Sequence, residues 1–427
     1  MLFVAYMFIV LIVLIFLGIP VFLSTLLTAI IFMIVLELPF SVIIIRVFGG
    51  IDSFSLMAIP FFIFAGNIIM EAKITDKIVG FSDAIVGQFK GGLGHINIVS
   101  SMLFAGIQGS GAADASAIGS VLIPAMKKQG YDSDYSVAVT ASSSMIGPII
   151  PPSIAMILFA YYTDLSVGRL FLGGLIPGVV VGVGLMVVHA VYYRIRKYSF
   201  PTREFNLRYF FHTFFHSLLA LIMPLIILFG IVFGVFTPTE SGIIACIYGL
   251  LYGFIISREL TIKKLPKIFV DSATMTAVVM ITIAMAGVLG NILVRLHFQS
   301  TLINFALATI GDPHQATLMI IFFMIVLGCF LDPTVLIAMF ASPVLAAGIA
   351  MGFDPIHFGI VMVLAMQLGA ITPPVGTFLF ISSSIAEVPL EKAVKALLPF
   401  FFLILVMVIV VLFVPSMTIG LSNLIYN

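Results

Sequence analysis

The stretch SSSMIGPIIPPSIAM, residues 142–156, interrupts a long apolar segment with serines, a glycine and three prolines. Proline has no amide hydrogen and clashes with the preceding helical turn, so this stretch predicts a break in a helix. A second stretch, QLGAITPPVGT at residues 367–377, has the same character. An interrupted helix is tolerated only in certain environments, and the sequence around both stretches indicates which environment this is.

The composition is that of a protein whose solvent is lipid. Of the 427 residues, 62% are hydrophobic and 9% are charged, whereas about a quarter of residues are charged in soluble domains. The net charge of +1 gives no electrostatic basis for binding nucleic acid. The HExxH, GxSxG and P-loop patterns of enzymes are not found. We therefore predict an all-α polytopic protein of the lipid bilayer that is not an enzyme and binds no nucleic acid.

Apolar runs divide the chain into predicted helices. A helix needs about 20 apolar residues to span a bilayer, and the runs that approach this length are 3–18, 21–37, 54–71, 169–193, 209–236, 239–257, 268–294 and 393–416. The runs 131–163 and 355–386 contain Pro-Pro pairs and are predicted to be broken transmembrane helices. The regions 94–126 and 315–350 each hold two segments too short to span, so we predict re-entrant hairpins. Two tilted spans are the alternative for each region.

Matching residues in the two halves indicate an internal repeat. With a shift of 222 residues, Gly147 falls on Gly369, and Pro151-Pro152 falls on Pro373-Pro374. A constant offset kept over tens of residues is the signature of a duplication. We therefore predict that each half contains one hairpin and one broken helix.

Lysine and arginine set the predicted orientation. The richest basic stretches, 194–208 and 258–267, are expected in the cytoplasm because positive residues are retained there. Counting spans from them places the N-terminus outside and makes the two hairpins enter the membrane from opposite sides. The predicted inverted repeats are 1–200, with scaffold helices in 1–71, hairpin 94–126 and broken helix 131–163, and 201–427, with scaffold helices in 209–294, hairpin 315–350 and broken helix 355–386.

Broken helices at matching positions indicate a transporter. Substrate and ions bind near the bilayer midplane between inverted repeats in many secondary transporters. Unwound backbone is tolerated at that depth only where it lines a polar cavity inside the protein. Its carbonyl groups, with serine and threonine hydroxyls, form a neutral cage that replaces the water around a small cation. A proline kink that only shapes packing is the alternative.

Each predicted hairpin tip carries one aspartate, Asp114 or Asp332, in apolar surroundings. An ionisable residue at membrane depth is costly and is a functional hypothesis by default. Helix capping is the simpler interpretation, because each aspartate begins the second arm of its hairpin. Capping and ion binding are compatible, and helix N-termini at both tips would also favour an anionic substrate.

These patterns define two groups of candidate residues. At least two sodium ions are expected, one near Ser110, Asp114, Ser143 and Gly147 and one near Gly328, Asp332, Thr334, Gly369 and Thr372. The substrate is expected between the breaks, near Ser142, Ser144, Ser153 and Thr377.

The motifs GSGAADASAIGSVLIPAM, GPIIPPS and ITPPVGT, together with the inverted hairpins, resemble the large membrane subunit of tripartite ATP-independent periplasmic (TRAP) transporters. The resemblance covers essentially the whole chain. It implies sodium-coupled uptake of an organic acid across a bacterial inner membrane by an elevator-type movement of the hairpin domain against a scaffold. By its whole sequence the chain looks most similar to the sialic-acid branch, with a C4-dicarboxylate as the next choice.

The family resemblance also implies two partners, a small four-helix membrane subunit and a soluble periplasmic substrate-binding protein. Because the chain begins directly with the large subunit, we expect the small subunit to be a separate chain. Arg295 lies at the outer end of the run 268–294, where basic residues are rare. It is the candidate contact for the binding protein, and snorkelling to lipid headgroups is the alternative.

Two other functions fit parts of the sequence. A self-sufficient sodium/divalent-anion symporter would have a related architecture and need no binding protein. A channel or a non-transporting membrane scaffold is a different class, but the chain shows no charged ring or repeated filter sequence.

Overall fold

The computed structural model describes residues 2–200, 204–302, 304 and 311–426, and these residues form helices and their connections without any strand. The elements of the first half are α1 (Leu2–Phe16), α2 (Val21–Val35), α3 (Ser41–Gly49), a 3-10 turn (Ser55–Met57), α4 (Ala58–Glu71), α5 (Ile74–Val86), α6 (Gly92–Gln108), α7 (Gly111–Gln129), α8 (Ser133–Ser144), α9 (Ile154–Thr163) and α10 (Val167–Ile195).

The second half repeats the order of a helix pair followed by a broken helix. Its elements are α11 (Leu207–Val232), α12 (Pro238–Leu251) with a π turn (Tyr252–Ile256), α13 (Leu265–Arg295), α15 (Pro313–Gly328), α16 (Pro333–Ala350), α17 (Pro355–Gly369), α18 (Thr377–Ala386), α19 (Leu390–Phe413) and α20 (Ser416–Tyr426). We call α6–α7 hairpin 1 and α15–α16 hairpin 2. The predicted fold class is confirmed. The division at residue 200 stays a prediction, and residues 201–203 at this boundary, including Arg203, lie outside the described residues.

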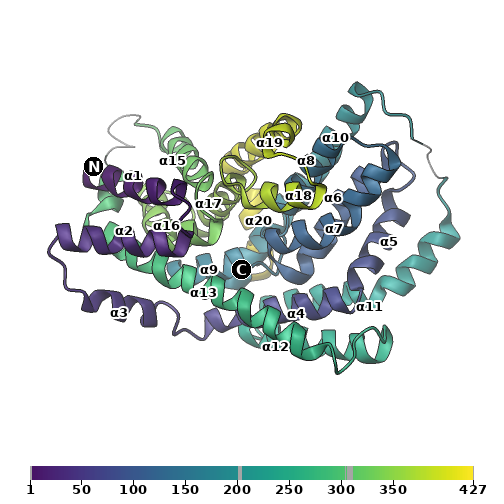
Figure 1. Cartoon of the computed structure of the whole chain (residues 1–427), viewed down its shortest axis with the longest axis horizontal. Helices are drawn as coiled ribbons and strands as arrows, with labels where there is room; N and C mark the ends of the chain where they lie inside the picture. Colours follow the sequence, from purple (N-terminus) through teal and green to yellow (C-terminus); the bar gives the residue numbers. More distant parts are fainter. Residues whose placement is uncertain (1, 201–203, 303, 305–310, 427) are drawn as a thin grey trace.

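The proline-rich stretches end their helices as predicted. After Ser144 the backbone changes to 3-10-type hydrogen bonds, as at the end of many helices. Met145, Ile146 and Gly147 each donate to the carbonyl group three residues earlier. The helix resumes at Ile154 beyond the prolines. In the second half, α17 and α18 are separated in the same way by residues 370–376. Figure 1 shows both broken helices between hairpin 2 on the left and hairpin 1 on the right.

Length and apolar composition allow six described helices to cross a membrane, namely α10, α11, α12 with its π turn, α13, α16 and α19. Helix α16 has 18 residues, so the prediction that both segments of 315–350 are too short to span is wrong for the second segment. Helices α1 and α2 have 15 residues each, fewer than the roughly 20 that a span requires, so their length does not support the two full spans predicted there. The predicted span 54–71 is bent by 72° into α5 at its end. The short helices α3, α5 and α20 were not predicted, because amphipathic or short apolar segments give a weak signal.

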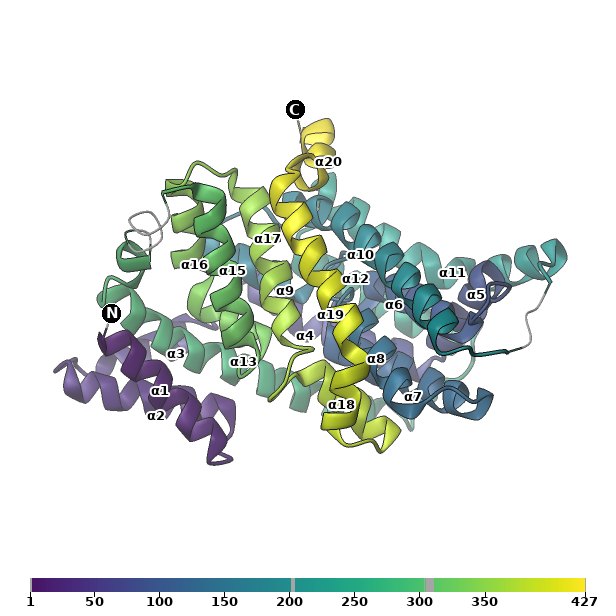
Figure 2. The same cartoon turned by 90° about the horizontal axis from the view of Figure 1, so that it is seen from above.

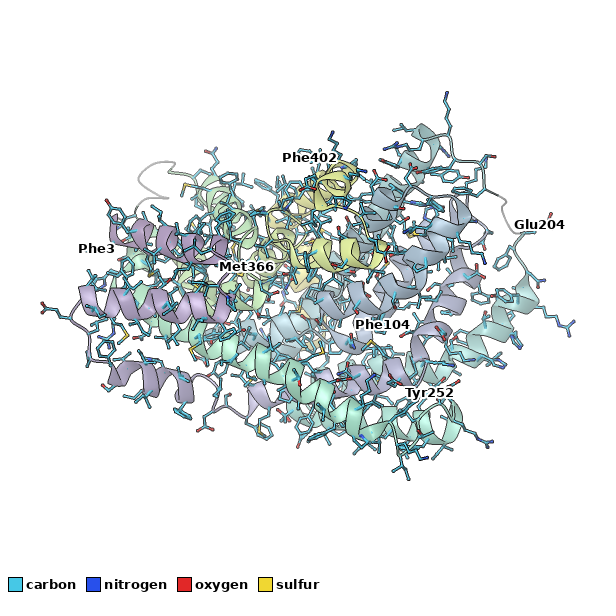
Figure 3. All side chains as sticks on the ribbon, in the orientation of Figure 1. Phe3, Phe104, Glu204, Tyr252, Met366 and Phe402 are labelled. Carbon is cyan, nitrogen blue, oxygen red and sulfur yellow. The ribbon has the colours of Figure 1, made fainter. Side chains whose placement is uncertain are left out.

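Helix α13 is the longest described helix and connects the two halves. It packs against α2, α4 and α16, while α4 packs against α12 (Figure 1). We call α4 and α13 the central scaffold pair. Side chains such as Phe104 and Met366 are buried inside the bundle, whereas Phe3 and Phe402 lie at its periphery (Figure 3).

Helix ends and loops lie at two opposite faces of the molecule. Lys73 forms an ion pair with Glu259, Lys264 pairs with Glu71, and the ammonium group of Lys127 donates to the Ala386 carbonyl. We call the face formed by residues 71–77, 127–134, 194–200, 257–267 and 386–395 the basic face. The opposite face brings together Gly49 and Tyr161, Phe54 and Thr239, and Val232 and Tyr426 through hydrogen bonds. The C-terminal helix α20 projects at one side of the molecule (Figure 2).

Candidate functional site

Each hairpin tip contacts the broken helix of its own half by a backbone hydrogen bond. The Ile154 amide donates to the Gly109 carbonyl at 3.1 Å, and the Val375 amide donates to the Cys329 carbonyl at 2.9 Å. Proline leaves other carbonyl groups of the breaks without a helical donor. The two tips and two breaks therefore meet in the same way in both halves, as the sequence repeat predicts.

Glycines permit this close approach. A Cβ atom added at Gly147 would lie 3.2 Å from the Ser110 carbonyl oxygen, and one added at Gly328 would lie 2.8 Å from the Cα atom of Gly369. Gly109 has a φ of +63° and leaves no room for a side chain beside the Pro152 carbonyl. The predicted site residues Gly147, Gly328 and Gly369 thus lie where tip and break touch.

Five polar side chains of hairpin 1 and α8 form a buried network. The Ser101 hydroxyl lies 2.7 Å from Oδ2 of Asp114 and 3.1 Å from the Ser143 hydroxyl. The Ser143 hydroxyl is also 2.9 Å from Oδ1 of Asn97, whose amide nitrogen donates to Thr140 at 2.8 Å. All five residues are buried. The network joins both hairpin arms to α8.

Asp114 is the charged group of this network. It is 1% exposed, and its Oδ1 atom has no hydrogen-bond partner within the described part of the chain. A buried carboxylate without a compensating charge costs several kcal/mol. The site therefore suits either a bound cation or a proton on the carboxyl group. Asp114 does not cap α7, because Ser110 is the capping residue and its Oγ accepts from the Ala113 amide at 3.5 Å.

The structure brings together part of the predicted first group. Asp114 and Ser143 share Ser101 as a hydrogen-bond partner, and Ser110 touches Gly147. Sequence reasoning missed Asn97, Ser101 and Thr140. The spacing of four residues between Asn97 and Ser101 in an apolar helix was the available signal, since such residues share one helix face.

In hairpin 2, Asp332 caps α16. Its Oδ1 accepts from the Thr334 amide at 2.9 Å and from the Thr334 hydroxyl at 2.6 Å, and its Oδ2 lies 3.4 Å from the Thr377 hydroxyl. The capping interpretation therefore holds for Asp332. Thr372 donates to the Leu368 carbonyl, four residues earlier in the chain, at 2.9 Å. Gly328 of the tip and Gly369 at the end of α17 contact each other.

A cavity of about 350 Å³ lies between the central scaffold pair and the two hairpin tips. Pockets for small molecules have roughly this size or more. Among the described residues that line it, none is Lys or Arg. The polar lining residues come from α4, both tips, α13 and the start of α18: Asn67, Gln108, Ser110, Thr282, Asp332, Thr334 and Thr377.

Of the four predicted substrate residues, only Thr377 lines this cavity. Ser153 is fully buried and caps α9, because its Oγ donates to the Pro148 carbonyl at 2.6 Å and accepts from the Met156 amide at 3.1 Å. Ser142 and Ser144 are also fully buried. Ser144 donates to the Thr140 carbonyl at 2.8 Å.

Two glutamines were not predicted at the site. Gln108 lines the cavity, and Gln367 lies beside the tips with Ser110 and Asp332. Both are buried, and the Oε1 atom of each has no hydrogen-bond partner among the described residues. Such groups are available to a ligand.

The cavity can attract an anion without a basic side chain. Ser110 and Asp332, which cap the N-termini of α7 and α16, both line it. Helix N-termini carry a partial positive charge and free amide groups. Arg295 is remote from this chemistry: it is exposed at the end of α13, and its Nε donates to Oδ1 of Asn291 at 3.1 Å.

A family model described as "Tripartite ATP-independent periplasmic transporter, DctM component" matches residues 8–417. The chain belongs to this family. It is thus a TRAP transporter permease and a membrane protein, not an enzyme. The broken helices and hairpins described above are the architecture of this DctM component in this chain.

Three curated relatives bear different substrate names. The isethionate permease protein DctMQ of Oleidesulfovibrio alaskensis is 33% identical over 89% of this chain and 60% of its own length. The C4-dicarboxylate large permease protein DctM of Pseudomonas aeruginosa is 32% identical over 89% of this chain and 88% of its own. The sialic acid large permease protein SiaM of Vibrio cholerae is 32% identical over the same shares.

A solved structure supports the fold alone. The YdaH transporter of Alcanivorax borkumensis superimposes with a TM-score of 0.60 at 12% identity, over 88% of each chain. The DctM chain thus shares its architecture with a transporter of very different sequence.

Proposed function

We propose that this DctM chain is the permease of a sodium-coupled importer of an organic acid. The observation that carries the proposal is the buried Asp114 carboxylate, whose Oδ1 accepts no hydrogen bond of good geometry from a described residue. Sodium prefers oxygen ligands, and the carboxylate, the hydroxyls of Ser101 and Ser143 and the carbonyl groups of the break supply them without a proton relay of Glu and His side chains.

The second proposed sodium site lies at the tip of hairpin 2. Asp332, Thr334 and Thr377 bring a carboxylate and two hydroxyls together. Thr372 and the close contact of Gly328 with Gly369 bring the carbonyl groups of the break beside them. Two bound cations beside the cavity would balance the negative charge of the substrate, because no Lys or Arg is among the described residues that line the cavity.

The proposed substrate is a small organic acid held in the cavity between tips and scaffold. Gln108, Thr377 and the helix N-termini offer hydrogen bonds to a carboxylate or to hydroxyls. Sialic acid remains our favoured substrate from the whole-sequence resemblance, and a C4-dicarboxylate is the next choice. The names of the relatives include both, as well as isethionate.

The proposed movement is an elevator in which hairpins and broken helices slide against the central scaffold pair. The cavity lies on this boundary, since α4 and α13 form one wall and the tips form the other. The positive-inside rule supports a cytoplasmic basic face, and we propose that the N-terminus and Arg295 lie on the periplasmic side of a bacterial inner membrane. The proposed partners are a small four-helix subunit and a periplasmic binding protein that docks near Arg295.

Uptake by proteoliposomes that contain the chain and its small subunit tests this proposal. We expect uptake of labelled sialic acid only with an inward sodium gradient and with added binding protein. Uptake in potassium buffer driven by a pH gradient would contradict sodium coupling. Uptake without the binding protein would identify a self-sufficient symporter, and flux that does not saturate would identify a channel.

A further inference from the structure

A groove on the basic face lies outside the transport site. It has a volume of about 530 Å³ and separates the segment before hairpin 1 from the end of α10. Lys90 and Arg194 are its basic lining residues, Val183 and Val187 form part of its apolar wall, and His95 lines its interior. No carboxylate is among the described residues that line it.

The basic side chains of Lys90 and Arg194 are available to pair with an anion. Lys90 and Arg194 are both exposed, and neither forms an ion pair with any described carboxylate. They belong to segments that are far apart in the sequence and converge on one cavity. A ligand with a negative charge would therefore bridge them.

The apolar wall continues from the groove along α10. Val183 is 52% exposed and Val187 is 57% exposed, and Val179 and Val191 extend the same row at a spacing of four residues. Residues with this spacing lie on one helix face. On a membrane helix such a face contacts acyl chains, so the groove combines a charged end with an apolar wall.

His95 gives a second, independent indication of a ligand. Its side chain is 5% exposed, its Nδ1 atom has no hydrogen-bond partner of good geometry among the described residues, and the polar group beside the ring is the Lys90 backbone. The ring is held edge-on by Phe89 at 5.8 Å and by His189 at 4.5 Å between ring centroids. A buried polar atom without a partner is costly, and a headgroup in the groove would supply the partner.

We propose that this groove binds one anionic phospholipid. The phosphate lies between Lys90 and Arg194, polar atoms of the headgroup reach His95, and an acyl chain follows Val183 and Val187. Basic pockets between membrane helices are suited to anionic headgroups. A free phosphate ion would use the cations but not the apolar wall.

Native mass spectrometry of the purified chain with its small subunit tests the proposal after delipidation. The probes are palmitoyl-oleoyl phosphatidylglycerol, phosphatidylcholine with the same chains, dihexanoyl phosphatidylglycerol and inorganic phosphate. We expect one tightly bound long-chain phosphatidylglycerol. The variant Lys90→Gln/Arg194→Gln should bind it about thirty-fold more weakly, because each basic residue near an anionic lipid contributes roughly five-fold.

The control variant Lys128→Gln/Lys392→Gln removes the same charge from exposed positions of the basic face outside the groove, and it should keep the original affinity. An equal loss in this control would overturn the proposal, as would equal binding of phosphatidylcholine. Equal affinity for the short-chain lipid or displacement by phosphate would indicate a simple anion site. A complex that binds no phosphatidylglycerol would also overturn the proposal.

Discussion

The hydroxyl of Ser101 on α6 lies 2.7 Å from Oδ2 of Asp114 on α7, so a single hydrogen bond joins the two arms of hairpin 1. The other carboxylate oxygen of Asp114 has no partner in the described residues. One oxygen thus holds the hairpin together while the other remains available to a ligand.

Replacing Asp114 by asparagine should abolish this charge with little change in shape. We expect the sodium concentration for half-maximal uptake to rise at least about ten-fold, because hydrogen bonds and contacts to charged groups contribute roughly 1.5–3 kcal/mol. Sodium titration of uptake in proteoliposomes measures the effect. Asp76→Asn, at an exposed position of α5, is the matched control. An unchanged sodium dependence of the Asp114 variant would remove this residue from the site.

Ser101→Ala should also weaken sodium binding, because it removes the donor that orients Asp114. A loss of about three- to ten-fold is expected from the contribution of one buried hydrogen bond, roughly 1 kcal/mol. The control is Ser120→Ala, since among the described residues the Ser120 hydroxyl bonds only to the Ala117 carbonyl of its own helix. If both alanine variants show the same sodium affinity, Ser101 has no part in ion binding.

Gly66→Ala should slow transport. A Cβ atom at this position would collide with the side chain of Gln108, which belongs to the tip of hairpin 1. Because Gly66 lies on the scaffold helix α4, the collision falls on the boundary across which we propose movement. The double variant Gly66→Ala/Gln108→Ala should be no slower than Gln108→Ala alone, because the added methyl group then no longer meets the Gln108 side chain.

The control for this pair is Gly80→Ala, because no described residue beyond its own helical turn lies within 4 Å of the added Cβ. Initial uptake rates at saturating sodium measure all the variants. Normal transport by Gly66→Ala would show that the two helices do not need this close contact.

Gly369→Ala should destabilise the protein. A Cβ atom there would meet the backbone of Gly328, and a backbone cannot move aside like a flexible side chain. Overpacking of this kind costs about 1–3 kcal/mol. The measurement is the thermal midpoint of the protein in detergent, determined from the loss of monodisperse protein with temperature. Gly420→Ala, which has open space, should match the original, and an equally stable Gly369→Ala would contradict the close contact.

Arg295→Glu should impair docking of the binding protein, because an exposed reversed charge would repel a carboxylate on the partner. We expect a higher concentration of loaded binding protein for half-maximal uptake, with sodium affinity unchanged. Lys128→Glu on the opposite, basic face is the control. Normal docking would leave Arg295 as a lipid-facing residue, and a parallel loss of sodium binding would make its role structural.

The sequence alone determined the two helix pairs and the two breaks. Proline cannot donate a backbone hydrogen bond, so Pro151-Pro152 and Pro373-Pro374 had to interrupt their helices. Gly147 and Gly369 fell at matching positions and so indicated the repeat. These are local properties of the chain and were readable without any contact information, whereas the close approach of tip and break at these glycines came from the structure.

The tertiary structure decided which polar groups share a site. Ser142 and Ser153 were expected to face the substrate, yet Ser153 satisfies its own helix end and Ser142 is fully buried. Gln108 instead reaches the cavity, and Ser101 joins the network of Asp114. Which side of an irregular break faces a cavity depends on how separate helices pack, because unwound backbone has no fixed period that would assign its side chains to one face.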